Sequence, residues 1–345
     1  MKALVFDRHG DLDNVRLMDR PVPIPGSGEV LVEIHAAALN RLDLWVLEGW
    51  PGLHLKLPHI MGSDGAGIIV GVGDGVGRFK QGDRVAINPT ICNDPADHFA
   101  RLGYDNMCDD YALFGEHVDG FYADYAVVPQ RNLLALPGPV PFETAAAASL
   151  VFVTAWHSLI TRGNLRPGES VLIVGAGGGV NTAAIQIAHL VGAGPILVVG
   201  SSATKLALAH ELGADAVINR HEVDWSREVY QLTNKRGVDV VVDNVGAATF
   251  QKSLRALRRG GRLLTVGNSS GPRFEIDNRY LFGKHLTIIG STMGTTLDYE
   301  RVMGLVFKGR LRPVIDTVYP LDQGSIALRR LQDGDVIGKL VLRIR

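Results

Sequence analysis

The segment VLIVGAGGGVNTAAIQIA, residues 171–188, runs from an apolar strand through a glycine-rich turn into a helical pattern. The free N–H groups and the dipole at the start of such a helix favour the phosphates of a dinucleotide. The third glycine of the G-x-G-x-x-G pattern is absent, because Val180 occupies its place and Asn181 follows. The packing of the helix against the strand must therefore accommodate the Val180 side chain at the position where the pattern has glycine. We predict that a dinucleotide binds at Gly175, Gly178, Gly179 and Val180.

Strand and helix patterns alternate around this segment, from about Pro141 onward. Such alternation is typical of an α/β fold, in which a parallel sheet is doubly wound with helices. Glycines mark the expected helix ends, as in the helix predicted over 249–259, which stops at Gly260. The candidate strands are residues 171–175, 196–200, 216–219, 238–245, 262–267 and 286–290.

The first third of the chain has a different pattern, in which short β-type runs alternate with glycine and proline. This pattern predicts a β-rich domain of antiparallel strands. The chain ends in the β-type segment GKLVLRI, which has no following helix, so we expect the tail to rejoin the first domain. Domains average ~150 residues, so a chain of this length should contain about two. We predict a β-rich domain over 1–140, a dinucleotide-binding domain over 141–290 and a returning segment over 291–345.

Composition and charge exclude several classes of protein. The 35 Lys and Arg residues against 36 Asp and Glu residues leave a net charge of -1, so no overall positive field attracts nucleic acid or an anionic membrane. The 46% hydrophobic content is too high for a disordered chain. The most apolar stretch, residues 145–156, is shorter than the ~18 apolar residues of a membrane span. With two cysteines and no visible signal peptide, we expect a soluble cytoplasmic protein without a disulfide framework, whose partner is a small-molecule substrate.

The end of the second strand indicates which cofactor binds. An NAD site places an acidic residue there for the ribose 2′-hydroxyl, but this strand ends in Gly200, Ser201 and Ser202. An acid would repel a 2′-phosphate, whereas the serine hydroxyls, Lys205 one turn later and Arg220 after the third strand are able to bind it. We therefore predict NADP(H). The alternative is that Lys205 and Arg220 are ordinary solvated charges.

Eight segments, spread over essentially the whole chain, follow one another in the same order as the corresponding segments of one protein family. They are GEVLVEIHAAALNRLD, GSDGAGIIVGVGDGVGRFKQGDRV, DGFYADYAVVP, VTAWHSL, LIVGAGGGV, LGADAVIN, VDVVVDNVGAATF and GKLVL. In these segments the chain resembles the medium-chain dehydrogenases/reductases. The resemblance implies a GroES-like catalytic domain closed by the C-terminal segment, an inserted Rossmann domain, and substrate bound in the cleft. It also implies a homodimer in which the strand at 286–290 pairs with its symmetry mate.

Zinc alcohol dehydrogenases of this family hold a catalytic zinc with a Cys, the His of a G-H-E motif, and a further Cys or Asp. This chain has Asn40, then Ser63 within Gly-Ser-Asp, then Leu150, so a catalytic zinc has too few ligands. Asn40 and Asp43 instead match the zinc-free quinone oxidoreductase branch. The resemblance to that branch implies that the nicotinamide end of the cleft is lined by Asn40, Asp43 and Thr154, and that further cofactor contacts come from Asn244 and Asn268.

Both cysteines lie in the interval where many relatives carry a four-cysteine zinc lobe. Residues 92–108 read CNDPADHFARLGYDNMC, and their spacing does not reproduce C-x2-C-x2-C-x7-C. Because zinc accepts sulfur, nitrogen and oxygen donors in a tetrahedron, a mixed structural zinc site is one interpretation. A lobe that has lost its metal is the other. The ligands of the mixed site would be Cys92, Asp97, His98 and Cys108.

The sequence thus predicts an oxidoreductase that transfers hydride from NADPH to a quinone, an enone or a related carbonyl compound without catalytic zinc. Two alternatives stay open. One is an alcohol dehydrogenase that acts on a primary or secondary alcohol through an unrecognised metal site. The other is a nucleotide-binding or structural protein of the same fold with little catalytic activity.

Overall fold

The chain forms two units in the computed structural model, which describes residues 1–345. Unit 1 comprises Met1–Val153 and Thr295–Arg345, and unit 2 comprises Thr154–Gly294. Unit 1 extends past the boundary expected at residue 140, because the start of the next helix is bound to it through an ion pair of 2.7 Å between Glu143 and Arg343. The C-terminal segment also belongs to unit 1.

Unit 2 is built around six parallel strands: β11 (Val171–Val174), β12 (Ile196–Gly200), β13 (Ala216–Asn219), β14 (Val238–Asp243), β15 (Leu257–Thr265) and β16 (Thr287–Gly290). They lie in the order β13-β12-β11-β14-β15-β16, so the six strands expected from the sequence form one sheet. Every residue of β11 and β14 is buried, which is why β11 reads as an unbroken apolar run and β14 has three consecutive valines at 240–242.

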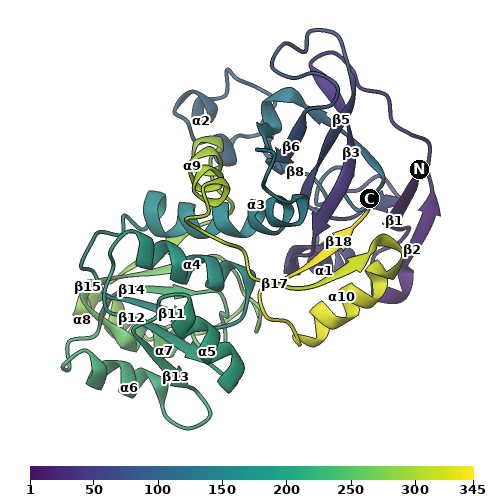
Figure 1. Cartoon of the computed structure of the whole chain (residues 1–345). Helices are drawn as coiled ribbons and strands as arrows, with labels where there is room; N and C mark the ends of the chain where they lie inside the picture. Colours follow the sequence, from purple (N-terminus) through teal and green to yellow (C-terminus); the bar gives the residue numbers. More distant parts are fainter. The chain divides into compact units, whose positions relative to one another are not determined.

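Five helices cover this sheet: α4 (Gly179–Leu190), α5 (Ala203–Glu211), α6 (Trp225–Leu232), α7 (Phe250–Ala256) and α8 (Asn278–Lys284). From β11 the chain moves outward through β12 to β13, and it then returns to β14 and moves outward the other way. Because parallel crossovers are right-handed, α4 and α5 lie on one face, while α6, α7 and α8 lie on the other (Figure 1).

The helix expected over 249–259 is shorter than predicted. It ends at Ala256, and the strand β15 begins at Leu257, so Arg258 lies in a strand rather than in a last helical turn. The reason is tertiary. Leu257 pairs with Val238 of β14, and the Arg258 guanidinium bonds to the buried carboxylate of Asp239.

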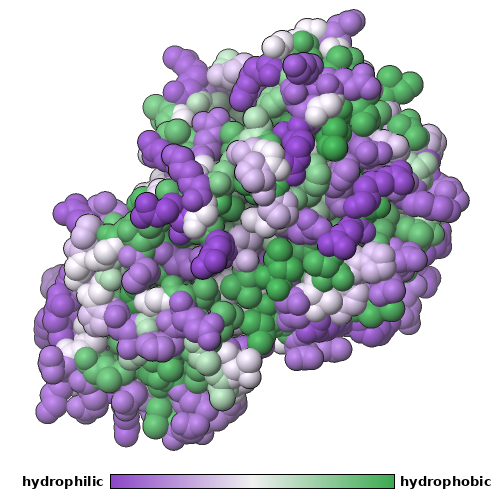
Figure 2. All heavy atoms as spheres, in the orientation of Figure 1, coloured by the Kyte–Doolittle hydropathy of each residue, from purple (hydrophilic) through white to green (hydrophobic).

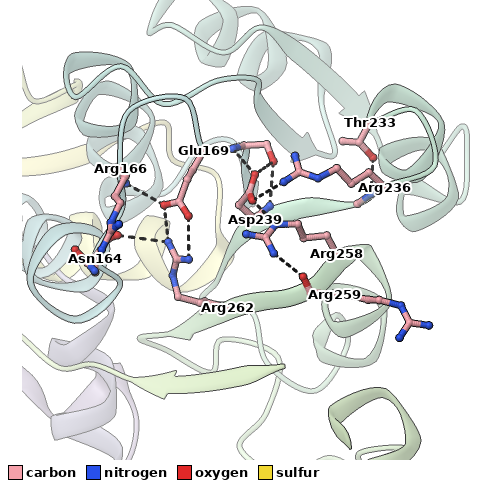
Figure 3. A network of polar contacts seen from close by, with 11 residues as sticks. Asn164, Arg166, Glu169, Thr233, Arg236, Asp239, Arg258, Arg259 and Arg262 are labelled. Carbon is pink, nitrogen blue, oxygen red and sulfur yellow. Dashed lines mark hydrogen bonds and ion pairs between the residues drawn. The ribbon is translucent and has the colours of Figure 1, made fainter. Parts of the chain in front are cut away.

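A polar network lies at the starts of β11, β14 and β15 (Figure 3). The Ser170 hydroxyl donates to Asp239 at 2.6 Å, and Arg258 pairs with the same carboxylate. Although burial acts to raise the pKa of Asp239, the hydrogen bonds from Ser170 and Arg258 lower it to about 2. Nearby, Arg262 forms two bonds with Glu169, of 2.6 and 3.0 Å. Charged side chains thus hold the strand starts together.

Unit 1 is mainly β-structure. Its strands are β1 (Lys2–Phe6), β2 (Val15–Asp19), β3 (Glu29–Ala38), β4 (His59–Ile60), β5 (Asp64–Val72), β6 (Arg84–Ile87), β7 (Thr90–Ile91), β8 (Ala112–Leu113), β9 (Tyr125–Pro129), β10 (Leu133–Ala135), β17 (Ile315–Pro320) and β18 (Lys339–Arg343). The largest sheet has the order β10-β6-β5-β3-β18-β17, and β9 also pairs with β3. Strand β18 pairs antiparallel with β3, so the tail of the chain completes this sheet. Alternate residues of β3 face the core, among them Val32 and Ile34.

The helices of unit 1 are α1 (Arg41–Glu48), α2 (His98–Arg101), α3 (Phe142–Trp156), α9 (Thr296–Phe307) and α10 (Gly324–Asp333). The last residues of α3 pass into unit 2, and a π-helix continues it to Arg162. By length and composition the helix Phe142–Arg162 could cross a membrane, but 78% of its most apolar window is buried inside the protein, as in a core helix. Hydrophilic side chains cover much of the visible surface of both units (Figure 2).

Candidate functional site

The glycine-rich turn of unit 2 joins β11 to α4. Gly175 has φ +110°, a conformation that L side chains rarely adopt. Gly178 is the N-cap of α4, and Gly179 and Val180 are its first two residues. Backbone N–H groups in a first helical turn have no partner within the helix, and together with the helix dipole they attract phosphate. The turn therefore has the chemistry that a diphosphate requires.

Asn181 packs α4 on the end of β11. It is 7% exposed, and its Nδ2 donates to the Val174 carbonyl at 3.2 Å. Its Oδ1 accepts a hydrogen bond from Nδ2 of Asn244 at 2.6 Å. Oδ1 of Asn244 is buried and has no hydrogen-bond partner within the chain. Buried acceptors are normally paired, so this orphaned oxygen fits a site that receives a hydrogen-bond donor from a bound dinucleotide.

Ser201, Lys205 and Arg220 belong to segments that lie near the end of β12. Ser201 follows directly after Gly200, and the side chain of Lys205 lies against the glycine-rich turn: a Cβ on Gly177 would come within 2.6 Å of Lys205 Cδ. The backbone N–H of Arg220 donates to the Gly200 carbonyl at 3.0 Å. The fold thus brings the Lys205 side chain beside the turn, and it brings the backbone of Arg220 to the end of β12, next to Ser201.

Asn244 and Asn268 lie in neighbouring loops, which follow β14 and β15. The N–H of Ser269 donates to the Asn244 carbonyl at 3.3 Å, and a Cβ on Gly246 would lie 3.2 Å from the Cα of Asn268. Both loops are at the carboxyl edge of the sheet, where open α/β sheets bind their ligands. The structure therefore brings the cofactor residues expected from the sequence to one edge of unit 2.

Asn40 and Asp43 belong to a buried polar cluster at the start of α1 in unit 1. Oδ2 of Asp43 accepts bonds from the Asn40 backbone N–H at 2.8 Å and the Tyr122 hydroxyl at 2.6 Å, while its Oδ1 is buried without a partner. Burial raises the pKa of Asp43 to about 6, although the bonds from Asn40 and Tyr122 and the charge of Lys339 oppose the rise. The pKa of Tyr122 is raised by burial and by the Asp43 carboxylate, so the phenol stays protonated as a donor.

The side-chain amide of Asn40 is engaged at both ends. Its Nδ2 donates to Asp64 at 2.9 Å, and its Oδ1 accepts from the Lys339 ammonium at 2.5 Å. Lys339 also donates to the Leu39 carbonyl at 2.6 Å and pairs with Asp64 at 3.0 Å. The other oxygen of Asp64 accepts the N–H of Leu150 at 2.7 Å. The amide of Asn40 therefore links Asp64 and Lys339 inside unit 1.

Reasoning from the sequence missed three members of this cluster: Asp64, Tyr122 and Lys339. Each lies in a segment already quoted for the family resemblance. Lys339 carried a signal that could have found it, since a lysine opens the otherwise apolar run KLVL, and a buried lysine needs a counter-charge.

Thr154 lies in unit 2, whereas Asn40 and Asp43 lie in unit 1. It is buried on α3, and its hydroxyl lies 3.7 Å from the sulfur of Met293. The structure brings Asn40 and Asp43 into direct contact with one another, and it places Thr154 at the start of unit 2.

A catalytic zinc does not fit the residues at the expected ligand positions. Asn40, Ser63 and Leu150 provide neither a thiolate nor an imidazole, and Leu150 has no donor atom in its side chain. The amide oxygen of Asn40 is bound to the cationic Lys339. These three positions therefore do not form a catalytic zinc site in unit 1.

The lobe around residues 92–108 differs from the expectation of a mixed zinc site. Cys92 and Cys108 form a disulfide, with their Cα atoms 6.0 Å apart. The Asp97 carboxylate caps α2, because it accepts the N–H groups of Phe99 and Ala100 at 2.7 and 3.1 Å, and the ring of His98 contacts that of Phe99. The four expected ligands are therefore not assembled, and the expectation of a chain without disulfide support was wrong at this point.

A different group of donor atoms comes together in this lobe. The sulfurs of Cys92 and Cys108 and a carboxylate oxygen of Asp110 lie within 4.8 Å of one another. In the disulfide state both sulfurs are bonded to each other and provide no thiolate for a metal.

Comparison with known proteins agrees with this architecture. The family described as "Alcohol dehydrogenase GroES-like domain" matches residues 26–138, and the family described as "Zinc-binding dehydrogenase" matches residues 179–308. The chain is 33% identical, over the whole of both chains, to a protein named NAD-dependent alcohol dehydrogenase from Sulfolobus acidocaldarius. It is 30% identical to the quinone oxidoreductase of Homo sapiens, over 99% of this chain and 97% of that protein.

A solved structure described as that of an NAD-dependent alcohol dehydrogenase has the same fold. It superimposes with a TM-score of 0.96 over the whole of both chains, at 40% sequence identity. Two curated relatives at 30% identity or more, matched along nearly their full lengths, show the family as well as the fold. The chain is a medium-chain dehydrogenase/reductase, related to both the zinc alcohol dehydrogenases and the quinone oxidoreductases.

Proposed function

We propose that this protein is an NADPH-dependent oxidoreductase that transfers hydride to an electrophilic carbon of a quinone, an enone or a related carbonyl compound without catalytic zinc. The observation that carries the proposal is the Lys205 side chain against the glycine-rich turn, with Ser201 and the backbone of Arg220 at the adjacent end of β12. When bound, the nicotinamide ring supplies the hydride. The chain supplies position and electrostatics.

The choice of NADPH rests on charge. A 2′-phosphate is an anion with several acceptor oxygens, which Arg220 and Lys205 would pair with and the Ser201 hydroxyl would donate to. NADH lacks this group, so neither cation would gain an anionic partner from it. Since two of the similar proteins carry NAD in their names, the proposal depends on these three side chains of this chain.

The remaining residues have proposed roles in binding and positioning. The N–H groups of Gly179 and Val180 would bind the diphosphate, and the Thr154 hydroxyl would anchor the nicotinamide carboxamide. Asn40 and Asp43 would keep the interior of unit 1 in one arrangement, because the Asn40 amide bridges two charged groups and Asp43 accepts the Tyr122 hydroxyl.

The cofactor assignment is tested by steady-state kinetics with NADPH and NADH on a panel of quinones, enones and aldehydes. We expect a lower KM for NADPH. Arg220→Ala removes a charged partner of the phosphate, so it should raise the KM for NADPH by about ten- to hundredfold and leave the KM for NADH nearly unchanged. A clear preference for NADH, or equal effects of the variant on both cofactors, contradicts the assignment.

Alcohol dehydrogenase activity is a second candidate, favoured by the 40% identity to a solved structure described as an alcohol dehydrogenase. The same assay distinguishes it. Oxidation of primary or secondary alcohols that is lost on adding a chelator supports this candidate, whereas full quinone or enone reduction in the presence of chelator supports a zinc-free reductase. Tight nucleotide binding with no turnover across the panel supports the third alternative, a catalytically weak protein of this fold.

The proposal includes a soluble cytoplasmic homodimer. Strand β16 is at the edge of the unit 2 sheet, with Ile288 and Ile289 half-buried and a strand partner on one side only. Pairing of two β16 strands around a two-fold axis would close this edge. Light scattering at micromolar concentration should give twice the mass of 37.2 kDa, and a monomer contradicts this part of the proposal.

A further inference from the structure

Three polar groups form a chain of hydrogen bonds at the carboxyl edge of the unit 2 sheet. The Val174 carbonyl accepts from Asn181 at 3.2 Å, and Asn181 accepts from Asn244 at 2.6 Å. Val174 ends β11 and Asn244 follows β14, so the bonds span the junction between these two strands. From this junction the chain leads outward in opposite directions, which is the point where open α/β sheets bind ligands.

The orientation of both amides follows from the first member of this chain. A backbone carbonyl can only accept, so the group of Asn181 that faces Val174 must be Nδ2. Oδ1 of Asn181 then faces Asn244 and requires a donor, which is Nδ2 of Asn244. The free end of Asn244 is therefore its Oδ1, an acceptor that is buried and has no partner.

Asn181 also contacts the glycine-rich turn. A Cβ on Gly175 would come within 2.3 Å of Asn181 Nδ2, so this amide needs glycine at position 175. The same side chain thus contacts the turn on one side and holds Asn244 on the other. Asn181 alone therefore connects the Asn244 amide, whose Oδ1 has no partner, to the glycine-rich turn.

We propose that Asn181 is a positioning residue for the cofactor, which holds the Asn244 amide in the orientation that presents Oδ1 to a hydroxyl or amide donor of the bound dinucleotide. The inference rests on the proposed function, because it needs a dinucleotide on unit 2. Ribose hydroxyls and the nicotinamide carboxamide are donors of the required kind. Since leaving a buried acceptor unpaired is unfavourable, its pairing on binding favours the complex.

A double-mutant cycle tests this proposal in the full-length protein with NADPH as the probe. Calorimetry would measure Kd for the wild type, Asn181→Leu, Asn244→Leu and the double variant. We expect about a tenfold rise in Kd for Asn181→Leu and at least the same rise for Asn244→Leu. The double variant should bind as Asn244→Leu does, because Asn181 has nothing to position once the second amide is gone.

Asn132 of unit 1 offers a matched control. It is a buried amide, 4% exposed, whose Nδ2 donates to the carbonyls of Asn88 and Thr90 at 2.9 and 2.6 Å. Asn132→Leu should lower the Tm of the ligand-free protein about as much as Asn181→Leu does and leave Kd unchanged. Asn181→Gly removes the amide without adding an apolar side chain, and it should raise Kd in the same way if Asn181→Leu fails to fold.

The outcomes separate this inference from the proposed function. Unchanged Kd in both Asn181 variants overturns the positioning role and leaves the proposed function standing. Losses that add in the double variant do the same, because they would mean that Asn181 acts independently of Asn244. A wild-type protein that binds neither NADPH nor NADH at millimolar concentration overturns both.

Discussion

The Lys339 ammonium lies 3.0 Å from the Asp64 carboxylate, with the two side chains 3% and 0% exposed. Lys339 begins β18 near the end of the chain, whereas Asp64 begins β5 in its first fifth. Asn40 bonds to both groups at once. A buried ion pair between distant parts of the chain therefore determines how the amide of Asn40 is oriented.

Breaking this pair from one side should be strongly destabilising. Lys339→Met leaves the Asp64 carboxylate buried without a counter-charge, so we expect the free energy of unfolding to fall by about 3–5 kcal/mol. Urea denaturation at pH 7 measures the change. The double variant Lys339→Met/Asp64→Asn removes both charges of this pair and should recover part of the loss; a double variant less stable than Lys339→Met contradicts the explanation.

The pKa of Asp43 makes a testable contribution to the pH dependence of stability. The folded protein has a pKa of about 6 at this carboxyl, against ~3.9 in an unfolded chain, so between these values the folded state binds more protons. Stability should then decrease as the pH rises from about 4 to about 6, by about 3 kcal/mol in total, and stay constant above that range. Lys339, Asp64 and Tyr122 face this carboxyl and are unchanged in the variant described next.

Asp43→Asn provides the comparison. The asparagine oxygen can still accept from the Asn40 N–H and from Tyr122, but the residue does not titrate. The free energies of unfolding of the wild type and the variant, measured at several pH values from 4 to 7, should differ by an amount that changes only within the window given above. A constant difference across this range would show that Asp43 has an ordinary pKa.

Ser170→Ala should weaken the network around Asp239. The Ser170 hydroxyl donates to this carboxylate at 2.6 Å, and a bond to a charged group contributes about 1.5–3 kcal/mol, so we expect a loss of that size at pH 7. Because the folded pKa of Asp239 is lowered to about 2, its stabilising effect is present above about pH 4 and disappears as the pH falls toward 2. The loss in Ser170→Ala should shrink over the same interval. Ser226→Ala removes a similar bond to the more exposed Asp224 and should cost less.

Cys92→Ser should destabilise the protein by removing the disulfide. For a loop with a sequence separation of 16 residues, the constraint on the unfolded chain contributes about 3 kcal/mol. Reductant should lower the Tm of the wild type and have no effect on the variant. Two reactive thiols together with stoichiometric zinc, in protein prepared without reductant or chelator, would show instead that this lobe binds metal.

Much of the fold could be predicted because its signals are local. Apolar runs such as VLIV at 171–174 and VVVD at 240–243 indicate strands buried on both faces, and the glycine-rich turn indicates a helix start that binds phosphate. The residues proposed for the cofactor also follow strand ends, and strand ends in a parallel sheet meet at one edge. Their proximity in unit 2 was therefore foreseeable.

Other features could not be predicted because they depend on partners far away in the chain. Arg258 and Arg259 fall within the helix expected over 249–259, but the preceding residue, Leu257, pairs with Val238 of β14, and both arginines therefore lie in β15. The sequence suggests Asp97 as a metal ligand. In the structure its carboxylate instead accepts backbone N–H groups from the first turn of α2. In both segments a contact that the local pattern does not contain outweighs the local preference.

The sequence by itself determined the α/β class, the family and the glycine-rich turn between β11 and α4, since each follows from residue types repeated at short spacing. Only the tertiary structure decided how the buried polar groups are paired: Lys339 with Asp64 across 275 residues, Asn181 with Asn244, and Cys92 with Cys108. The physical reason is that a polar group removed from water must be satisfied by whichever group the packing brings within hydrogen-bond distance, and periodicity along the chain does not specify that group.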